Sequence, residues 1–459
     1  MFFSSLEHSA LDIRHSAVLI FFCLTSVIWG ATNYVSFSGS HTPPFTNWIT
    51  AATNIQSAID VASNGDTVLV TNGTYSAGGV ADYGNTFGYG VFSYGISQIS
   101  IHQPITVRSV NGPVFTVIEG QGPLGSNAVR CAYVTNGATL TGFTLTNGFT
   151  QTVGANDFPG IACLADRIVS NCYAANNSDR FSGGGVLCEP SAVVSNCFII
   201  DNRSGFFGGG VHQGVLEDSS LIGNQSIYGG GASLVIAENC VVYSNTAHSG
   251  GGAYNSDVRD SIISGNIATN GGGIDRFAAG LVENCIISDN TAVNAGGGIK
   301  SGLAESCTIT KNSAPTGGGT YNTTVNNSIV YYNSSNQWSY GLYQNSCTIP
   351  EPSGANDGGN NITNPPQFMN WSAGDYRLNS TSLCIDTGSN QTWMVNALDI
   401  EGAPRIIGVD MGAHEYTLEV NDTPPQANAY QQLQTHTFYV TNDQDWIQFF
   451  GTSNHTYKV

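Results

Sequence analysis

The stretch at residues 271–298 reads GGGIDRFAAGLVENCIISDNTAVNAGGG, and the same order of landmarks recurs along the chain. Triple glycines are separated by 25 or 21 residues and begin at seven positions: Gly183, Gly208, Gly229, Gly250, Gly271, Gly296 and Gly317. A fixed period of roughly 20–50 residues is typical of solenoids, in which each repeat packs only on its neighbours. The repeat therefore indicates the fold class before local propensities are considered.

A small residue and an asparagine keep step with the glycines. Eight rows place an asparagine five positions after a cysteine or serine. The small residues are Cys172, Cys197, Ser219, Cys240, Ser261, Cys285, Cys307 and Ser328, and the asparagines are Asn177, Asn202, Asn224, Asn245, Asn266, Asn290, Asn312 and Asn333. Alanine, valine, leucine or isoleucine stands two positions after each small residue. Because side chains two apart share one face of a strand, this face is expected to form the core.

Each row has room for short strands and corners but not for a helix. Only four or five residues lie between an asparagine and the next triple glycine. Rows stacked at about 4.8 Å would pair with their neighbours through parallel sheets and bury one continuous interior column. The sequence therefore predicts an all-β chain, a parallel β-helix of roughly a dozen coils.

The three landmarks have distinct physical uses. Glycine permits positive φ and close backbone approach, which suits a tight corner. Asparagine can hydrogen-bond the same residue one coil away, which predicts an asparagine ladder. Interchange of cysteine and serine fits a small buried slot better than a disulfide, which needs both partners, so we expect a reduced, stacked cysteine column.

The chain divides into four expected segments. Arg14 and His15 precede an apolar run at 17–29 that is too short to span a bilayer, so residues 1–31 are expected to be a signal peptide. Residues 32–340 are expected to form the β-helix, with a short N-terminal capping helix near residues 53–64 that starts at an asparagine. Residues 341–417 would close it, and the composition changes again at 418–459.

Composition limits the partners. Only 10% of residues are charged, and 13 Lys and Arg stand against 32 acids, which gives a net charge of -19. Nucleic acids and anionic membranes demand a basic surface, so neither is expected as a partner. No segment beyond the signal peptide approaches transmembrane length.

Several motifs resemble known families. IQSAIDVASNGDTVLVTNGTY at 55–75 resembles the first coil of right-handed parallel β-helix proteins of the pectate-lyase-like class, and the glycine rows are similar to polymorphic outer-membrane-protein repeats. ITNPPQFMN, LCIDTGSN and DIEGAPRIIGVDMGAHEY resemble the closing region of secreted bacterial β-helix proteins called choice-of-anchor Q. These resemblances cover about residues 32–416 and imply a right-handed β-helix.

The tail resembles another family. Residues 418–459 are similar to the first half of the bacterial pre-peptidase C-terminal domain, through Asp422, Pro424, Ala427, His436, Asp443, Asp445, Trp446 and Phe449. The resemblance implies an incomplete β-sandwich after the β-helix.

One column of charges is the first candidate for chemistry. Counting two residues back from the Cys/Ser position gives Glu217, Glu238, Arg259, Glu283 and Glu305. Stacked carboxylates repel one another, so the side chains of this column would extend into water, bind a cation or form ion pairs with Arg259. A solvated face with a central ion pair is the plainer interpretation.

The resemblance to pectate lyases implies a catalytic alternative, in which Ca²⁺ acidifies a proton that Arg or Lys removes. Candidate Ca²⁺ ligands are Asp218, Glu238 and Asp260, and Arg259 or the pair Asp275 and Arg276 would supply a base. The motif around the base of those lyases is not recognisable here. No cofactor beyond Ca²⁺ is suggested.

Two further groups of side chains are candidates for function. Arg405, Asp410, His414 and Glu415 form a dense set whose simplest role is ion pairing inside a C-terminal cap. Aromatic residues that either stack on sugar rings or pack between coils are Tyr228, Tyr243, Tyr254, Tyr331, Tyr332, Trp338 and Tyr340.

The expected function is that of an exported bacterial module, secreted or on the outer cell surface. Adhesion or contact with a polysaccharide or cell-surface glycan, without catalysis, is the leading hypothesis. A polysaccharide lyase or glycoside hydrolase acting on an acidic polysaccharide is the alternative, and a structural spacer is the third.

Overall fold

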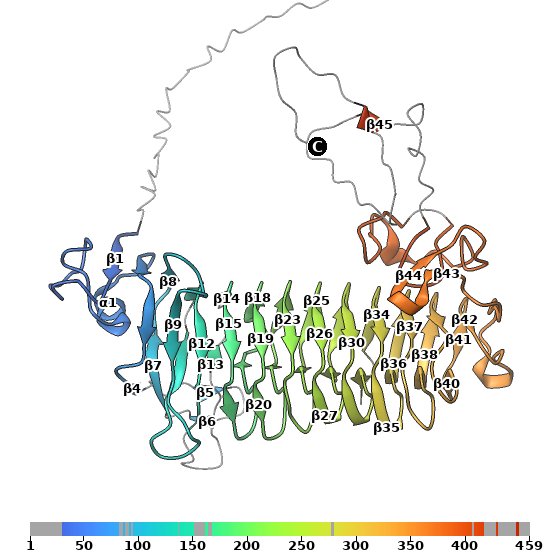
Figure 1. The fold of residues 1–459 in the computed structure, drawn as a ribbon, viewed down its shortest axis with the longest axis horizontal. Helices are drawn as coiled ribbons and strands as arrows, with labels where there is room; N and C mark the ends of the chain where they lie inside the picture. The colour runs from blue at the N-terminus through green and yellow to red at the C-terminus, as the bar shows by residue number, and fades with distance from the viewer. Residues whose placement is uncertain are drawn as a thin grey trace, which may run out of the picture.

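A computed structural model describes residues 30–81, 95–135, 137–150, 168–276, 280–405 and 408–416. It also describes the backbone of five strands outside those ranges: β5 Thr86–Phe87, β6 Val91–Phe92, β13 Ile161–Cys163, β45 Asn428–Ala429 and β46 Ile447–Gln448. The described strands stack side by side into an elongated solenoid, with the first coils at one end and the closing region at the other (Figure 1). The predicted parallel β-helix is confirmed.

Two long sheets run the length of the solenoid. Sheet B holds twelve described strands, all paired in parallel, and so confirms the predicted dozen coils. Its strands are β3 Gly73–Tyr75, β9 Thr116–Glu119, β12 Thr144–Thr146, β15 Tyr173–Ala175, β19 Phe198–Ile200, β23 Ser220–Ile222, β26 Val241–Tyr243, β30 Ile262–Ser264, β34 Ile286–Ser288, β37 Thr308–Thr310, β39 Ile329–Val330 and β42 Cys347–Thr348.

Sheet A is wider because most coils contribute two strands to it. Its 23 described strands are β1 Thr32–Val35, β2 Thr67–Val70, β4 Val80–Ala81, β7 Ile96–Ile101, β8 Thr106–Ser109, β10 Arg130–Val134, β11 Thr139–Thr141, β13, β14 Ile168–Ser170, β17 Val186–Leu187, β18 Val193–Ser195, β21 Val211–His212, β22 Val215–Glu217, β24 Ala232–Ser233, β25 Ile236–Glu238, β28 Ala253–Tyr254, β29 Asp257–Arg259, β32 Ile274–Asp275, β33 Leu281–Glu283, β36 Ile299–Glu305, β38 Thr320–Asn326, β40 Trp338–Ser339 and β41 Tyr343–Gln344.

Shorter strands complete the coils and the ends. A third side of the solenoid is formed by β16 Ser178–Asp179 with β20 Arg203–Ser204, and by β27 Thr246–Ser249, β31 Ile267–Asn270 and β35 Thr291–Ala295. The closing region contains the antiparallel pair β43 Phe368–Asn370 and β44 Asp375–Leu378, with 3-10 helices η1 Gly354–Asn356, η2 Trp371–Ala373 and η3 Thr392–Met394. Strands β5 and β6 pair with each other, as do β45 and β46.

The cysteine column lies inside the core as predicted. All nine cysteines of the described ranges are buried and free of disulfides. Cys240 directs its thiol to the carbonyl oxygen of Glu238 at 3.1 Å. Where serine takes the position, its hydroxyl also accepts a hydrogen bond from the backbone of the preceding coil, as Ser261 Oγ does from Cys240 N at 2.9 Å. Serine is therefore a functional replacement in this slot.

The asparagine ladder is also confirmed. Asn245 illustrates the pattern, because its Nδ2 donates to Leu221 O at 2.9 Å and to Asn266 Oδ1 at 3.0 Å. Its Oδ1 in turn accepts the backbone N–H of Asn224 at 2.8 Å. Both Asn245 and Asn266 are fully buried. Each rung thus satisfies buried backbone groups as well as its neighbours.

Three different constraints explain one glycine triplet. Gly250 has φ of +65°, a region that favours glycine. A Cβ on Gly251 would overlap Gly272 O of the next coil, and one on Gly252 would lie 2.8 Å from Gly273 O and 3.1 Å from Asn266 Nδ2. The triplet therefore makes an inward corner at which adjacent coils and the asparagine ladder touch the backbone.

A short helix covers the first coils. Helix α1, Ile55–Val61, begins after Asn54, whose Oδ1 accepts the N–H of Ser57 at 2.8 Å. Ile55, Ala58 and Ile59 are buried in the core cluster. The predicted N-terminal capping helix is confirmed.

The other end extends further than the repeat suggested. The last of the eight asparagine rows is at Asn333, but β42 and the bridge between Cys347 and Ile362 continue the stacking beyond it. This coil lacks a triple glycine, and Gly319 N bonds Gln337 O instead. The closing region then folds back over the last coils, where Asn327 Nδ2 donates to Ser389 O at 2.7 Å (Figure 1).

Two predictions lie almost entirely outside the described residues. The expected signal peptide spans residues 1–31, of which 1–29 lie outside the described residues, and the incomplete β-sandwich falls on 418–459, of which only β45 and β46 are described. Both stay predictions. In the described part of the chain, no helix has the length and apolar character needed to cross a membrane.

Candidate functional site

The triple-glycine corners bring two rows of side chains together. One row precedes each triplet and the other stands two residues after it, so the rows face each other across the corner. We call the line of side chains along these corners the corner face, and it spans five successive triplets. It consists of Phe207, His212, Tyr228, Tyr254, Asp275 and Lys300.

The first half of the corner face is aromatic. Phe207 stacks on His212 with ring centroids 5.5 Å apart and on Tyr228 at 5.3 Å. Tyr228 contacts Tyr254 at 5.0 Å with an interplanar angle of 45°. Phe207, Tyr228 and Tyr254 are partly exposed, so ring edges and phenol groups reach the surface. Ring pairs of this kind hold one another in place across coils.

The second half carries an ion pair. Lys300 Nζ lies 3.2 Å from Asp275 Oδ2, and the side chains are 27% and 6% exposed, respectively. Burial raises the pKa of Asp275, although Lys300, a hydrogen bond from Ser249 and the nearby His248 favour its charged form. Burial, together with the same carboxylate, raises the pKa of Tyr254. Tyr254 and Asp275 are paired in register on the neighbouring strands β28 and β32, so the ion pair is continuous with the aromatic rings.

His212 is a neutral member of the line. Its Nδ1 lies 2.7 Å from Ser233 Oγ, and the residue is only 9% exposed. Burial lowers the pKa of His212 to about 4, so the imidazole carries no charge near neutral pH. The corner face consequently has one formal positive and one formal negative charge, which are paired.

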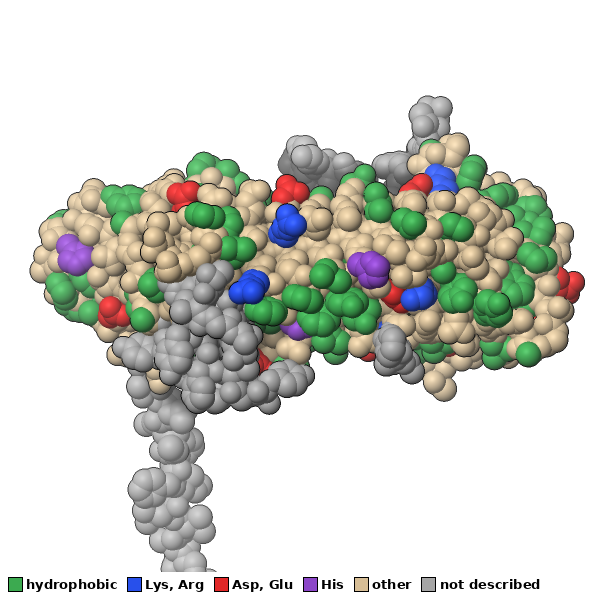
Figure 2. All heavy atoms as spheres, turned by 90° about the horizontal axis from the view of Figure 1, so that it is seen from below, with side chains coloured by type: hydrophobic (Ala, Val, Ile, Leu, Met, Phe, Trp, Pro, Cys, Tyr) green, Lys and Arg blue, Asp and Glu red, His purple; other side chains and the backbone are tan. Residues whose placement is uncertain are grey.

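The surface around this side of the solenoid is poor in charge. Figure 2 shows the molecule from below, the side on which β20, β27 and β35 lie in Figure 1. Hydrophobic side chains gather near the middle of the view, and only a few basic, acidic and histidine side chains interrupt the uncharged surface. Such a surface favours ligands that offer hydroxyl groups and apolar edges over densely charged ones.

The predicted column of charges forms in register. Glu217, Glu238, Arg259, Glu283 and Glu305 pair in that order along sheet A. Arg259 sits between two carboxylates, with Nη1 3.5 Å from Glu238 Oε1 and Nε 3.5 Å from Glu283 Oε1. This is the central ion pair of the plainer interpretation.

Glu283 differs from the other acids of the column because the closing region lies beside it. Its side chain is 12% exposed, and the adjacent Asn284 donates to Leu398 O at 3.0 Å. Burial raises the pKa of Glu283 to about 7, against the opposing effect of Arg259. The covered position leaves Glu283 little access to a polymer.

The candidate Ca²⁺ ligands are not brought together. Asp218 and Asp260 occupy left-handed turn positions, with φ of 48° each, and are separated by the coil that carries Asn239. Each accepts a hydrogen bond from an asparagine of the next coil, Asn239 at 2.5 Å and Asn284 at 2.6 Å. Across the described ranges, three or more His, Cys, Asp or Glu side chains nowhere gather as a metal site would require.

Asp275 and Arg276, adjacent in sequence and together a candidate base, belong to different networks of contacts. Asp275 belongs to the corner face, whereas the Arg276 guanidinium is buried and pairs with Asp257 at 2.9 Å. Arg276 also donates to the carbonyl oxygens of Ser256 and Leu281. These contacts give the buried Arg276 guanidinium a structural role.

The dense group of the closing region is an internal network, as its simplest role implied. Arg405 pairs with Glu415 and donates to Asn284 Oδ1 at 2.7 Å. Asp410 Oδ1 accepts the N–H of Asp386 at 2.8 Å. Burial raises the pKa of Glu415 to about 7 and that of Asp410 to about 6.

The seven aromatic candidates separate into three groups. Tyr228 and Tyr254 pack on each other, and Tyr331, Tyr332 and Trp338 pack at the last coils or against the closing region. Tyr243 and Tyr340 are 48% and 63% exposed. Packing between coils thus accounts for most of these rings.

The sequence did not single out Phe207, His212, Ser249 or Lys300. Their signal was available, because each stands one residue before or two residues after a triple glycine. Only the inward turn of the corner shows that these two positions meet. The Glu/Arg column was predictable from a fixed offset within one strand. Such an offset does not connect residues that lie on opposite sides of a corner.

No family model and no curated protein matches the sequence. Similar solved structures include pectate lyase Pel9A, with 15% identity, a TM-score of 0.45 and coverage of 84% of this chain and 98% of that one. A rhamnogalacturonan lyase has 13% identity and a TM-score of 0.38 over 74% of this chain and 91% of its own. The Azotobacter vinelandii mannuronan C-5 epimerase AlgE6 A-module has 14% identity and a TM-score of 0.33 over 68% and 95%. The parallel β-helix is defined by the strand pairing above, independently of these similarities.

Proposed function

We propose that this chain is an exported β-helix module that binds a polysaccharide along the corner face. The observation that carries the proposal is the unbroken line from Phe207 to Lys300, in which the aromatic rings contact one another, Tyr254 is paired in register with Asp275, and Asp275 forms an ion pair with Lys300. A polymer lying parallel to the solenoid axis would meet ring edges first and then hydroxyl, carboxylate and ammonium groups. This mixture suits sugar rings, which have both apolar C–H faces and hydroxyl groups.

Charge favours a polysaccharide that is neutral overall. The chain has a net charge of -19, and the one lysine of the corner face is already paired with Asp275. A polyanion would meet long-range repulsion that this single ion pair does not offset. An acidic polysaccharide is therefore the less favoured ligand.

Retention in affinity electrophoresis tests the proposal. The full chain would be run through gels that contain neutral or acidic polysaccharides, beside Tyr254→Ala, Lys300→Ala and the control Tyr243→Ala, whose ring is exposed on sheet B. We expect the first two variants to bind about tenfold more weakly than the unmodified chain and the control to bind normally. Equal retention of all four proteins, or no retention by any gel, would contradict the proposal.

A second candidate is cleavage of the polysaccharide, and Asp275 is the observation that favours it. A largely buried carboxylate beside a lysine, with burial raising its pKa, is a common arrangement in catalytic sites. Among the described residues that influence the pKa of Asp275, none is a second carboxylate. Hydrolysis by a carboxylate pair thus has less support here than β-elimination, which requires a uronic acid and could therefore act only on the acidic polysaccharides of the panel.

Product analysis separates cleavage from binding. Incubation with the same polysaccharides, with Ca²⁺ or with a chelator, would be followed by ultraviolet absorption of unsaturated ends and by reducing ends. A lyase should produce unsaturated ends that Asp275→Asn abolishes. Retention without either product would leave the binding module, and new reducing ends alone would indicate a hydrolase.

Export and surface location are part of the proposal and rest on the apolar run at 17–29. Fractionation of a bacterial host that expresses the full chain, with mass determination of the mature N-terminus, tests this part. We expect the chain outside the cytoplasm with about the first 31 residues removed. An intact chain confined to the cytoplasm would contradict export.

A further inference from the structure

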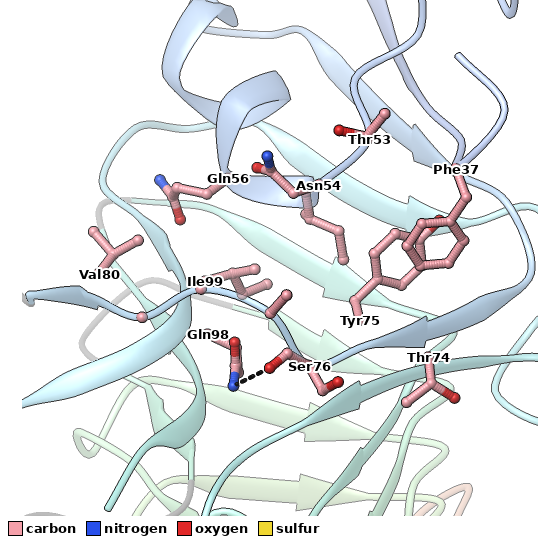
Figure 3. A pocket seen from close by; sticks show the side chains of 14 residues that line it. Phe37, Thr53, Asn54, Gln56, Thr74, Tyr75, Ser76, Val80, Gln98 and Ile99 are labelled. Atoms are coloured by element: carbon pink, nitrogen blue, oxygen red, sulfur yellow. Dashed lines mark hydrogen bonds between the residues drawn. The ribbon is translucent and has the colours of Figure 1, made fainter. Parts of the chain in front are cut away.

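A separate pocket lies at the N-terminal end of the solenoid, remote in sequence from the corner face. It has a volume of about 300 Å³ and opens between the start of α1, the segment after β3 and strand β7. Figure 3 shows Asn54 and Gln56 on the α1 side, Gln98 and Ile99 from β7, and the rings of Phe37 and Tyr75 lying against each other. The volume is at the small end of the roughly 300–1,000 Å³ found for ligand pockets.

An exposed aromatic ring forms one wall of the pocket. Phe37 stacks on Tyr75 with centroids 4.6 Å apart and an interplanar angle of 17°. The ring also lies over Gly73, where an added Cβ would overlap it. Phe37 nevertheless remains 55% exposed, whereas Tyr75 is buried. The packing therefore fixes the orientation of Phe37 but leaves much of its surface free for a ligand.

Two amide groups offer unused hydrogen-bonding atoms. Gln98 Nε2 donates to Ser76 O at 3.2 Å, and Asn54 Oδ1 accepts the N–H of Ser57. Within the described ranges, Gln98 Oε1 and Asn54 Nδ2 have no protein partner. Gln56 is different, because both ends of its amide bond the backbone of Ser100. Gln98 Oε1 is thus available as an acceptor and Asn54 Nδ2 as a donor. Each side chain is fixed in place by the hydrogen bond that the other atom of its amide makes.

The lining is uncharged. None of the 14 residues around the pocket is Asp, Glu, Lys, Arg or His. A ligand with a formal charge would lose hydration without gaining a partner of opposite charge. A fully apolar ligand would in turn leave Gln98 Oε1 and Asn54 Nδ2 without water or a substitute. The chemistry selects a small neutral molecule with an apolar face and several hydroxyl groups.

From these observations, we infer that this pocket binds one neutral sugar ring, with the ring against Phe37 and its hydroxyl groups toward Gln98 and Asn54. The site is distinct from the corner face and goes beyond the function proposed above. It would let the module recognise a single or terminal neutral sugar unit independently of any polymer along the coils.

Saturation-transfer NMR of the full chain with methyl glycosides of neutral hexoses, and with a uronic acid for comparison, tests the inference. At least one neutral glycoside should receive saturation, and the uronic acid should receive little. Phe37→Ala should weaken binding about tenfold. Ala77→Trp, which places a bulky side chain at an exposed lining position, should abolish it.

Phe198→Ala is the matched control, because this exposed phenylalanine also contacts a tyrosine, Tyr173, at 5.2 Å but lies on β19, four strands along sheet B from the β3 wall of the pocket. It should bind as the unmodified chain does. Thermal melts would show that Ala77→Trp and Phe37→Ala are folded. Absence of binding by every neutral glycoside, or binding that neither pocket variant reduces, would overturn the inference. Polysaccharide retention in the gel assay is a separate readout, so failure of one site does not imply failure of the other.

Discussion

At the scale of single residues, this fold depends on buried side chains that hydrogen-bond the backbone of neighbouring coils. The Asn245 amide bonds Leu221 O, Asn266 Oδ1 and the backbone N–H of Asn224, all inside the core. Ser261 similarly accepts from Cys240 N and donates to Arg259 O. The spacing of these residues made both ladders predictable, because each repeats at one fixed position of the coil.

Removing one rung should destabilise the solenoid strongly. Asn245→Ala would remove the side-chain partner of two buried backbone groups of the preceding coil, Leu221 O and Asn224 N–H, and each such unpaired group costs about 1–3 kcal/mol. We expect the free energy of unfolding to fall by roughly 3 kcal/mol or more in chemical denaturation. Asn294→Ala is the control, since Asn294 is exposed on β35 and should change stability by less than about 0.5 kcal/mol. Similar losses for the two variants would show that the ladder is not specially stabilising.

The cysteine column makes a finer distinction. Ser261→Ala should cost about 1–3 kcal/mol, because Cys240 N–H loses its acceptor. Ser261→Cys should cost less than Ser261→Ala, since cysteine fills this slot in neighbouring coils and sulfur is a weak acceptor. Denaturant titration of both variants measures the order. If Ser261→Cys lowered the free energy of unfolding as much as Ser261→Ala does, cysteine and serine would not be interchangeable in this slot.

At the scale of elements, the triple glycine is the corner that assembles the candidate site. Its close backbone approach was predictable from glycine alone. Its consequence for side chains was not, because the rows on either side of the corner lie on different strands. Asp275 was identified from the sequence, yet its partners Lys300 and Ser249 belong to neighbouring coils and are separated from it by 25 and 26 residues.

The middle glycine of a triplet should be the least replaceable. A Cβ on Gly251 would overlap Gly272 O of the next coil. A Cβ on Gly65 would have no atom within 4 Å, so the cost of a substitution there comes only from the backbone φ of +89°. We expect Gly65→Ala to cost about 1 kcal/mol and Gly251→Ala to cost several times more or to prevent accumulation of folded protein. Circular dichroism melts give the comparison. A Gly251→Ala protein as stable as Gly65→Ala would mean that the coils can move apart at the corner.

At the scale of the whole molecule, few charges are buried, and several of the buried carboxyl groups favour protonation. Burial raises the pKa of Asp179, Glu283 and Glu415 to about 7 and that of Asp410 to about 6. In the unfolded chain these groups ionise near their ordinary values, so they stabilise the folded state at low pH. This contribution is lost as the pH rises through about 6–7.

The chain should therefore melt at a higher temperature near pH 5 than near pH 8, by about 5 °C. Asp375 and Glu401 have lowered pKa values because the Arg377 guanidinium hydrogen-bonds Asp375 and the His414 ring lies 3.7 Å from the Glu401 carboxylate. The stability that these two groups contribute is lost only in stronger acid. Scanning calorimetry across this range checks the sign. Glu415→Gln should flatten the dependence, and a melting temperature that rises from pH 5 to pH 8 would contradict these pKa shifts.

Hydroxyl-radical footprinting tests polysaccharide binding along the corner face most directly. The full chain would be compared with and without the polysaccharide that retains it most strongly in the gel assay. Mass spectrometry would measure oxidation of individual side chains. We predict protection of Phe207, Tyr228 and Tyr254, which are partly exposed on the corner face, and unchanged oxidation of Tyr243 and Tyr340, which are exposed elsewhere. Protection confined to Tyr243 or Tyr340, with the three corner rings oxidised as in the free protein, would contradict binding along the triple-glycine corner.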